Sequence, residues 1–272
     1  MAFSRDRIRH PFALRRLRVS AVDRVVPNIV RVTLTGPELA DFASSGPGDH
    51  VKVFFPDPAS GILTLPEVDA QGLRRGEQGV VISRDYTPRA IRPAELELDL
   101  DIVIHGVDGP ASAWAQIAKP GDWLGVAGPR GSRLVPSGIE ELVVVADETG
   151  LPAAGRWLEL LPAGVPVTGL FFVLDESVES YFDQEAASRL DAEWITRDDG
   201  RTALEESLRS LGSIGGATFV FMAGEADLLV PLRRYLRHEL SLPAEQVSAS
   251  GYWRRGIVNL DHHAPLDPGD PD

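Results

Sequence analysis

The sequence predicts two domains in 272 residues, an N-terminal antiparallel β-barrel over residues 1–137 and an open parallel α/β domain over residues 138–272. Short segments of the first half alternate apolar and polar residues between turns that contain glycine and proline, which is typical of antiparallel strands. The second half alternates continuous apolar segments with helical patterns, which is typical of a parallel sheet covered by helices. The hydrophobic fraction of 43% and the charged fraction of 25% fit an ordinary globular protein.

In the first half, strands are predicted at residues 15–20, 29–35, 50–55, 80–87, 95–105 and 121–127. Residues 95–105 show the clearest period of two, with leucines and isoleucines on one face and Glu95, Glu97, Asp99 and Asp101 on the other. A short helix is expected at residues 111–118. Residues 61–79 are polar and contain several glycines, so we expect a mobile excursion there.

In the second half, strands are predicted at residues 141–146, 165–174, 192–196, 218–223 and 246–251, with helices at residues 151–161, 184–190, 203–211 and 227–240. The apolar run ELVVVA at residues 141–146 indicates a strand that is buried on both faces. Pro231 falls inside the last helix. If that helix begins near Asp227, we expect the proline to replace an N–H group of the first turn, which has no helical partner.

The net charge of −13, from 27 basic and 40 acidic residues, argues against general nucleic-acid binding. No apolar run approaches the ~18 residues that span a bilayer, so we expect no membrane insertion and a cytoplasmic location. We also expect a monomer. The absence of cysteine excludes disulfides and thiolate-bound metal sites. We expect the arginine-rich N-terminus and the aspartate-rich C-terminus to be solvated ends of the chain.

Arg84, Asp85, Tyr86 and Thr87 form the first candidate binding motif. On an extended strand, Arg84 and Tyr86 point to one face and Asp85 and Thr87 point to the other. A tyrosine ring can pack against a flat ring such as isoalloxazine, and a guanidinium group can bind pyrophosphate through two hydrogen bonds. An ordinary edge strand with an exposed arginine and tyrosine would show the same residues.

The sequence Gly109-Pro110-Ala111-Ser112 begins the short helix of the first half. Small residues at a helix start leave the first N–H groups open to an anion, and Ser112 adds a hydroxyl; simple capping is the alternative. His105-Gly106 ends the preceding strand, so residues 80–132 together predict a cradle for a flavin with a pyrophosphate tail. We assign no proton transfer to His105 and no catalytic side chain elsewhere.

The α/β half lacks the Gly-x-Gly-x-x-Gly fingerprint of dinucleotide-binding folds. Its first strand ends instead in Asp147-Glu148-Thr149, and another strand ends in Gly224-Glu225. Carboxylates do not suit a phosphate site, but they suit the hydroxyls and the amide of a ribose and a nicotinamide. Both strands should end at the carboxyl edge of the sheet, where open α/β sheets bind ligands.

The last predicted strand leads into Tyr252-Trp253-Arg254-Arg255 between two glycines. Two aromatic rings could shield a flavin, and two arginines could attract an anionic substrate. An aromatic plug with solvated arginines is the alternative interpretation.

Taken together, these motifs resemble the siderophore-interacting protein family, the FAD-dependent ferric-siderophore reductases of the ferredoxin-NADP-reductase-like superfamily. The matching segments are Asp49–Pro56, Arg84–Arg89, Leu100–Gly106, Gly109–Ala115, Pro120–Asp122, Ala146–Thr149, Ala223–Glu225 and Gly251–Gly256. They occur in the family's order from about Arg15 to Gly256. Pro88 departs from the pattern, since an apolar residue is commoner there, and it removes a backbone donor next to the proposed FAD contacts.

The resemblance implies a barrel that binds FAD and an α/β domain that binds NADH or NADPH, with the C-terminal segment returning to the flavin site. The FAD contacts that it implies are Arg84, Asp85, Tyr86, Thr87, Asp101, Val103, His105, Gly106, Ala111 and Ser112. The nicotinamide nucleotide would contact Asp147, Thr149 and Glu225, and Trp253 would shield the flavin. Asp175 and Glu176 would repel a 2′-phosphate and favour NADH, whereas Arg197 and Arg201 would favour NADPH.

The resemblance also implies a ferric siderophore as electron acceptor. Many ferric siderophores are anionic, so local cations must offset the negative net charge, and Lys52, Arg254 and Arg255 are the candidates. FAD can take two electrons from a nicotinamide and pass them singly to iron(III), so no protein metal ligands are required. His262 and His263, in the acidic tail, are expected to be incidental.

Two other functions remain open from the sequence. The protein could be a flavin reductase that passes electrons to a ferredoxin-type protein, or it could be a ferric-siderophore binding protein without enzymatic activity. Flavin absorption of the purified protein would exclude the second function. Re-oxidation of the reduced protein by ferric siderophores would distinguish the main hypothesis from the first.

Overall fold

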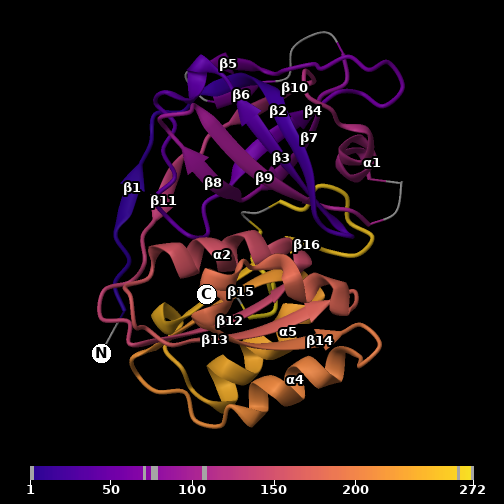
Figure 1. Cartoon of the computed structure of the whole chain (residues 1–272). Coiled ribbons are helices and arrows are strands. Elements are labelled where there is room, and N and C mark those ends of the chain that lie inside the picture. Colours follow the sequence, from indigo (N-terminus) through magenta and orange to yellow (C-terminus); the bar gives the residue numbers. More distant parts are fainter. Residues whose placement is uncertain (1–2, 70–71, 75–78, 106–108, 262–263, 271–272) are drawn as a thin grey trace. The chain divides into compact units, whose positions relative to one another are not determined.

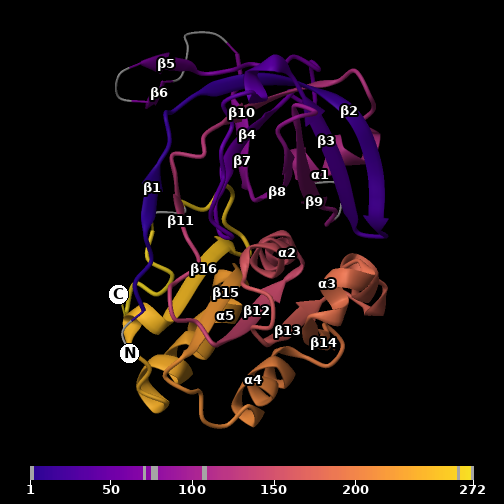
Figure 2. The same cartoon turned by 60° about the vertical axis from the view of Figure 1, so that its left-hand side comes forward.

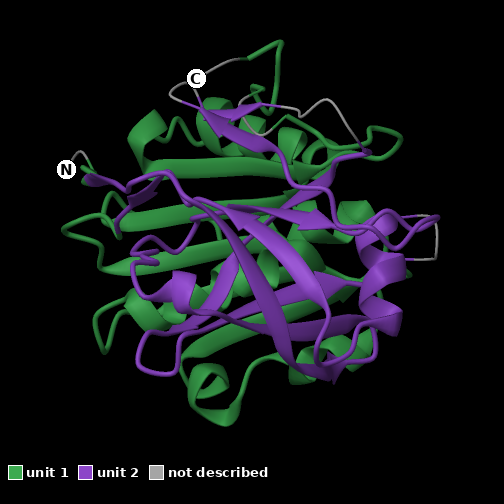
Figure 3. Ribbon diagram, turned by 90° about the horizontal axis from the view of Figure 1, so that it is seen from above, with its two compact units in different colours: residues 1–6, 135–272 green, residues 7–134 purple. Residues whose placement is uncertain are grey.

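The structure is a computed structural model that describes residues 3–69, 72–74, 79–105, 109–261 and 264–270 (Figure 1). It contains two units (Figure 3), one formed by residues 7–134 and one formed by residues 1–6 and 135–272. The chain therefore passes between the units twice, at Asp6–Arg7 and at Leu134–Val135. Gly106, His262 and His263 lie outside the described residues.

The unit of residues 7–134 contains a seven-stranded antiparallel sheet in the order β7-β4-β10-β2-β3-β9-β8. Its strands are β2 (Leu14–Val26), β3 (Ile29–Thr35), β4 (Val51–Phe55), β7 (Ile82–Tyr86), β8 (Pro88–Arg92), β9 (Glu97–Val103) and β10 (Trp123–Ala127). The edge strands β7 and β8 are separated in the chain by Thr87 alone, so the sheet must curl until its two edges are neighbours (Figure 2). The predicted antiparallel β domain is confirmed as this curled half-barrel.

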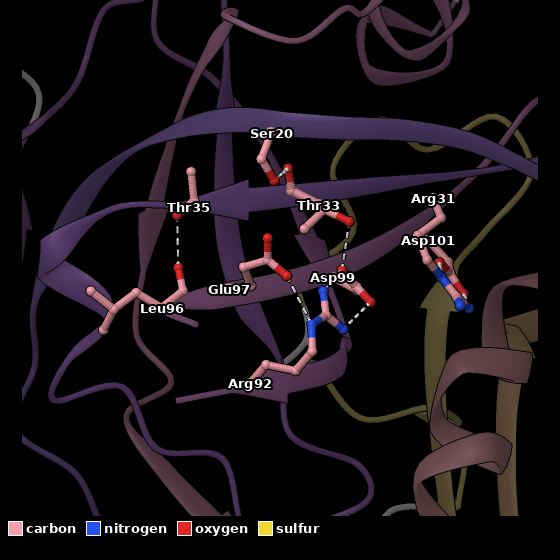
Figure 4. A network of polar contacts seen from close by, with 9 residues as sticks. All are labelled: Ser20, Arg31, Thr33, Thr35, Arg92, Leu96, Glu97, Asp99 and Asp101. Carbon is pink, nitrogen blue, oxygen red and sulfur yellow. Dashed lines mark hydrogen bonds and ion pairs between the residues drawn. The ribbon is translucent and has the colours of Figure 1, made fainter. Parts of the chain in front are cut away.

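The hydrophobic core inside the curled sheet confirms the predicted alternation of inward and outward side chains in β9. Leu98, Leu100 and Ile102 of β9 are fully buried with apolar residues of β2, β3 and β4. Asp99 and Asp101 on the other face are also buried, because arginines on the neighbouring strands pair with them (Figure 4). Each buried charge thus has a partner, as burial requires.

Several short elements were not predicted from the sequence. Strand β1 (Arg7–Arg9) pairs with β11 (Gly131–Arg133), and β5 (Glu67–Asp69) pairs with β6 (Gly72–Arg74) inside the stretch that was expected to be mobile. Pro88 begins the edge strand β8, a position where the missing N–H group costs no ladder bond. The predicted helix is α1 (Pro110–Ile117).

The other unit contains five parallel strands in the order β14-β13-β12-β15-β16, which confirms the open parallel α/β domain. The strands are β12 (Glu141–Asp147), β13 (Val167–Val173), β14 (Leu190–Thr196), β15 (Thr218–Glu225) and β16 (Val247–Trp253), and the helices are α2 (Leu151–Leu160), α3 (Gln184–Ser188), α4 (Arg201–Ser210) and α5 (Ala226–Arg234). Shorter helical turns of this unit are η2 (Glu148–Gly150), η3 (Glu176–Tyr181), η4 (Tyr235–Glu239) and η5 (Ala244–Gln246), and η1 (Pro37–Leu39) lies in the half-barrel unit. The strand order reverses between β12 and β15, so a ligand site is expected there.

Helices cover both faces of this sheet (Figure 2). Trp157 of α2 packs against Phe219 and Phe221 on one face, with ring centroids 5.5 Å apart in each pair. On the other face, leucines of α4 and α5 pack against Val143, Val145, Val220 and Met222. Both faces of β12 and β15 are therefore buried, as their continuous apolar sequence predicts. Within the described part of the chain, no helix is long and apolar enough to cross a membrane.

The expectation for Pro231 is wrong. Helix α5 begins at Ala226, so Pro231 lies beyond its first turn and cannot donate the helical hydrogen bond to the carbonyl of Asp227. The helix then changes to the π-helical turn η4, which ends at Glu239.

The expectation of solvated termini is also wrong. Phe3 is buried against Phe219, and the guanidinium group of Arg5 lies over the Trp157 ring. At the other end, Asp267 pairs with Arg234 at 2.6 Å, and Asp270 pairs with Arg233 at 2.7 Å and with His238 at 2.8 Å. These ion pairs hold the pKa values of Asp267 and Asp270 below their usual range. Specific partners on the folded chain therefore hold both ends.

Candidate functional site

Strand β7, which carries the Arg-Asp-Tyr motif, lies at one edge of the curled sheet and pairs with β4 on its inner side. All five of its residues are partly exposed, in contrast to the buried central strands. An edge strand presents backbone N–H and C=O groups that the ladder does not use. Such groups suit the polar rim of an isoalloxazine ring, so the strand fits a flavin.

Tyr86 and Arg84 occupy the same face of β7. The Tyr86 ring packs edge-on against Phe55, with centroids 6.0 Å apart. Burial raises the pKa of Tyr86, so its hydroxyl remains protonated and can donate a hydrogen bond. Arg84 donates one bond to the carbonyl of Ser83 at 2.7 Å, which leaves further guanidinium donors for a phosphate. Thr87 is buried between β7 and β8.

The opposite face of β7 brings two predicted site residues together. Lys52 Nζ and Asp85 Oδ1 form an ion pair of 2.7 Å across the β4–β7 ladder. The two side chains are 28% and 21% exposed, so each partly neutralises the other at a half-buried position. Lys52 is therefore not an isolated cation, and its pairing with Asp85 could not be read from the sequence.

The side chain of Asp101 links β9 to the neighbouring strand β3. Both of its carboxylate oxygens accept bonds from Arg31 of β3, at 2.7 and 2.8 Å, and the carboxylate is fully buried (Figure 4). Val103, two residues later, pairs with Ile29 at the end of the ladder. Contacts of this strand with FAD would thus come from its backbone and its end. The sequence analysis did not predict a role for Arg31, although the alternation of residues 29–35 places Arg31 on the polar face of β3.

Among the described residues, no side chain caps the N-terminus of helix α1. Pro110 is its first residue, and its first turn contains no acidic residue. Ser112 Oγ accepts a hydrogen bond of 3.2 Å from the backbone N–H of the exposed His105, which joins the end of β9 to the helix. A Cβ atom on Gly109 would lie 3.2 Å from the His105 ring, so the two segments approach closely at a glycine. N–H groups that no described side chain caps, next to buried Ala111, fit a pyrophosphate.

The α/β unit contains a cavity of about 220 Å³ at the carboxyl ends of its strands. Its lining residues are Asp147, Phe172, Arg197, Gly200, Arg201, Glu225, Leu228, Trp253 and Arg255. The structure thus brings together two of the predicted nucleotide contacts, Asp147 of β12 and Glu225 of β15. Trp253 of β16, which was expected to shield the flavin, lines the same cavity. Phe172, Gly200 and Leu228 were missed, but all three lie at or just beyond element ends on this same edge.

Asp147 is the centre of a hydrogen-bond network at this edge. Its Oδ1 accepts from Thr149 N at 2.8 Å and from Thr149 Oγ1 at 2.5 Å. Its Oδ2 accepts from Glu225 N and from Trp253 Nε1, each at 2.8 Å. Burial raises the pKa of Asp147 above its usual range, although the four hydrogen bonds act in the opposite direction.

Two buried glutamates hold the arginines of the cavity. Glu148 accepts from Arg197 at 3.2 Å, and Glu225 pairs with Arg201. The glutamate side chains are 2% and 4% exposed, whereas the arginine side chains are 41% and 47% exposed. Burial and the neighbouring Asp147 raise the pKa of Glu148, and Arg197 opposes this. The guanidinium groups thus present their remaining donors toward solvent at the cavity.

The three predicted substrate cations have different surroundings. Arg255 is exposed and lines the cavity. Arg254 does not line it, because its guanidinium group pairs with Asp227 at 3.0 Å and donates to the carbonyl of Leu266 at 3.1 Å. Lys52 belongs to the other unit.

Comparison with known proteins gives the same division of the chain. Residues 18–133 match the family model of the siderophore-interacting FAD-binding domain, and residues 139–256 match that of the siderophore-interacting protein. The NADPH-dependent ferric-chelate reductase of Escherichia coli K12 is 35% identical over 251 residues, which cover 91% of this chain and 96% of that protein. The ferric vibriobactin reductase ViuB of Vibrio cholerae is 32% identical over 248 residues, covering 88% and 89%.

Solved structures show the same fold. A siderophore utilization protein from T. fusca superposes with a TM-score of 0.88 at 38% identity and covers 96% of this chain and 100% of its own. Phthalate dioxygenase reductase, at 15% identity and a TM-score of 0.64, shares the fold over 88% of this chain. The fold also resembles that of the ferredoxin reductase in carbazole 1,9a-dioxygenase, at 15% identity and a TM-score of 0.62. With both halves matched, the chain belongs to the siderophore-interacting protein family.

Proposed function

We propose that this protein transfers electrons from NADPH through FAD to a ferric siderophore and thereby releases iron(II). The observation that carries the proposal is the presence in one chain of a cradle that fits FAD and a cavity at the carboxyl edge of a parallel sheet. Relatives named as ferric reductases, at 32% and 35% identity over nearly the whole chain, support the acceptor.

The residues of the half-barrel bind and orient FAD. Tyr86 supplies a ring surface, the free edge of β7 supplies backbone groups, and Arg84 and the start of α1 bind the pyrophosphate. Thr87, Val103 and His105 complete the cradle, while Asp85 and Asp101 hold neighbouring cations in place. When bound, FAD takes two electrons as a hydride and releases them singly, which suits a one-electron acceptor such as iron(III).

The arginines of the cavity favour NADPH over NADH. Arg197, Arg201 and Arg255 line it, and the first two retain donors beyond those that bind Glu148 and Glu225. Guanidinium groups suit a 2′-phosphate because they bind it through paired hydrogen bonds. Asp175, which the sequence suggested as a repulsive group, accepts a hydrogen bond from Ser177 N as a helix cap and does not line the cavity.

The ferric siderophore is the substrate, and its iron is cargo. Arg255 attracts its negative charge against the net charge of −13, and Arg254 stabilises the segment that carries Arg255. Lys52 contributes less, because Asp85 partly neutralises it. Siderophores bind iron(II) far more weakly than iron(III), so reduction releases the metal without protein ligands. We assign the reaction to a monomer in the cytoplasm, where nicotinamide nucleotides are available; cell fractionation and light scattering test these two points.

The test is a stopped-flow experiment on the purified yellow protein. NADPH should bleach the flavin absorption faster than NADH, and ferric siderophores should then restore it while a ferrous chelator turns coloured. If no ferric chelate re-oxidises the reduced protein faster than buffer does, the proposal is wrong. Faster re-oxidation by a ferredoxin would favour a protein partner, and purification without flavin would favour a binding protein.

A further inference from the structure

Asp147 was expected to contact the nucleotide, but the structure shows that both of its oxygens are engaged within the protein. A carboxylate offers about four acceptor positions, and four donors occupy them: the N–H and hydroxyl of Thr149, the N–H of Glu225 and the indole N–H of Trp253. Asp147 is only 2% exposed. A ligand would therefore find no free acceptor on this side chain.

The neighbouring strand ends are shaped around this carboxylate. Gly224 has a φ of 152°, and a Cβ atom there would lie only 2.7 Å from Asp147 Cγ. The β15–β16 ladder shifts its register immediately afterwards, pairing Gly224 with Gly251 and then Glu225 with Trp253. The shift passes over Tyr252, so the local bulge changes the direction in which the Trp253 side chain points. The indole N–H then reaches Asp147 at 2.8 Å.

Of the three residues that donate to Asp147, Glu225 and Trp253 form part of the cavity wall. Trp253 lines it directly, and Glu225 lines it and pairs with Arg201, which lines it as well. One buried carboxylate on β12 thus determines where side chains from β15 and β16 stand. Trp253 lies 106 residues away from it in the sequence.

We propose that Asp147 is a positioning residue for nucleotide binding, which acts by fixing the Trp253 indole and the Glu225–Arg201 pair in the cavity wall rather than by touching the nucleotide. The inference rests on the proposed function of the cavity as the NADPH site. It predicts that Asp147 and Trp253 contribute to nucleotide affinity as one unit.

The test is a double-mutant cycle on the FAD-loaded protein, with NADP⁺ as the probe so that no turnover occurs. The first variant is Asp147→Asn, in which an NH2 group replaces one carboxylate oxygen, so two of the four donors lose their acceptor. The second is Trp253→Phe, which keeps an aromatic ring but removes the indole N–H group. The matched control is Asp183→Asn, since Asp183 also caps a helix, accepting from Ala186 N at 2.9 Å, but does not line the cavity. Isothermal titration calorimetry gives the Kd, and thermal unfolding monitors the fold.

Each single variant should raise the Kd about tenfold, because each disrupts the hydrogen bond between the Trp253 indole and the charged group of Asp147. The double variant should bind about as weakly as either single variant, and the control should bind like the wild type. NADP⁺ should also change the tryptophan fluorescence of the wild type and change that of Trp253→Phe much less.

Three outcomes would overturn the inference. The Kd of Asp147→Asn could equal that of the wild type, or the two single effects could multiply to about a hundredfold, which would mean independent roles. If Asp147→Asn does not fold, Trp253→Phe decides alone, and an unchanged Kd in that variant contradicts the inference. Failure of the wild type itself to bind NADP⁺ would instead refute the assignment of the cavity, so the two failures are distinguishable.

Discussion

The two units both bury acidic side chains, but they satisfy these acids differently. In the half-barrel, Asp99 and Asp101 lie in the middle of β9, and each receives two hydrogen bonds from an arginine on a neighbouring strand (Figure 4). In the α/β unit, Asp147 lies at a strand end and is held by backbone, hydroxyl and indole groups, all of them neutral.

The pKa values reflect this difference. Burial raises the pKa of Asp99, but hydrogen bonds from Arg92 and Thr33 outweigh it and leave the pKa below its usual range. Burial also raises the pKa of Asp147, and there the neutral donors do not outweigh it. The first arrangement ties strands together, whereas the second is typical of a site built for binding, where perturbed groups gather. Four predictions test this contrast.

The largest effect is expected from Asp101→Ala. The variant removes a fully buried carboxylate and leaves Arg31, whose side chain is 26% exposed, without its bidentate partner. We expect the free energy of unfolding to fall by about 3 kcal/mol, measured by urea denaturation. Asp191→Ala, at an exposed position of β14, is the control and should change it by less than about 0.5 kcal/mol. Equal effects of the two variants would show that the Arg31–Asp101 pair does not tie the strands.

Arg84→Ala should weaken FAD binding about tenfold without a comparable loss of stability, because one charge-assisted contact to the pyrophosphate is lost. The Kd for FAD, measured by fluorescence quenching after deflavination, checks this. Arg74→Ala is the control, since Arg74 forms an exposed pair with Glu67. If the variant binds FAD as tightly as the wild type, Arg84 does not contact the pyrophosphate of FAD.

Arg197→Ala should raise the KM for NADPH about tenfold and leave the KM for NADH nearly unchanged, since only NADPH carries the 2′-phosphate. Steady-state reduction of a ferric chelate with each donor measures this. Arg209→Ala is the control, because Arg209 pairs with Glu205 and Glu239 and does not line the cavity. A parallel increase for both donors would place Arg197 elsewhere on the nucleotide.

The smallest effect is expected in the pH dependence of stability, where the two acids should act in opposite directions. The lowered pKa of Asp99 contributes stability above the unfolded value of about 3.9, and this contribution is lost as the pH falls through the folded value. The raised pKa of Asp147 contributes stability below about pH 3.9, and this contribution is lost as the pH rises through the folded value.

Urea denaturation of the wild type, Asp99→Asn and Asp147→Asn between pH 3 and pH 7 measures both contributions. Asp99→Asn should flatten the loss of stability on the acid side, and Asp147→Asn should flatten the decline above about pH 4. Identical pH profiles for the two variants would contradict the contrast between the units.

Local patterns predicted most of the strands and helices. The alternation in β9 and the apolar run of β12 each determine which faces are buried, because side chains alternate across a strand and parallel central strands are covered on both sides. Strand β8 was missed, since Pro88 and two arginines obscure its pattern and its pairing with β9 is what makes it a strand. Pro231 was misjudged because it is the fifth residue even of a helix that begins at Asp227, so its N–H group is not one of the first four, which lack a helical partner.

The sequence by itself determined the fold class and the family, because these depend on residue types along short segments. Only the tertiary structure decided which charges pair. Lys52 with Asp85, Arg31 with Asp101 and Asp147 with Trp253 are joined by strand register, sheet curl and a bulge. Such pairings depend on contacts between segments far apart in the chain, so residues that looked like direct ligands, such as Asp147, prove to be bound first to the protein itself.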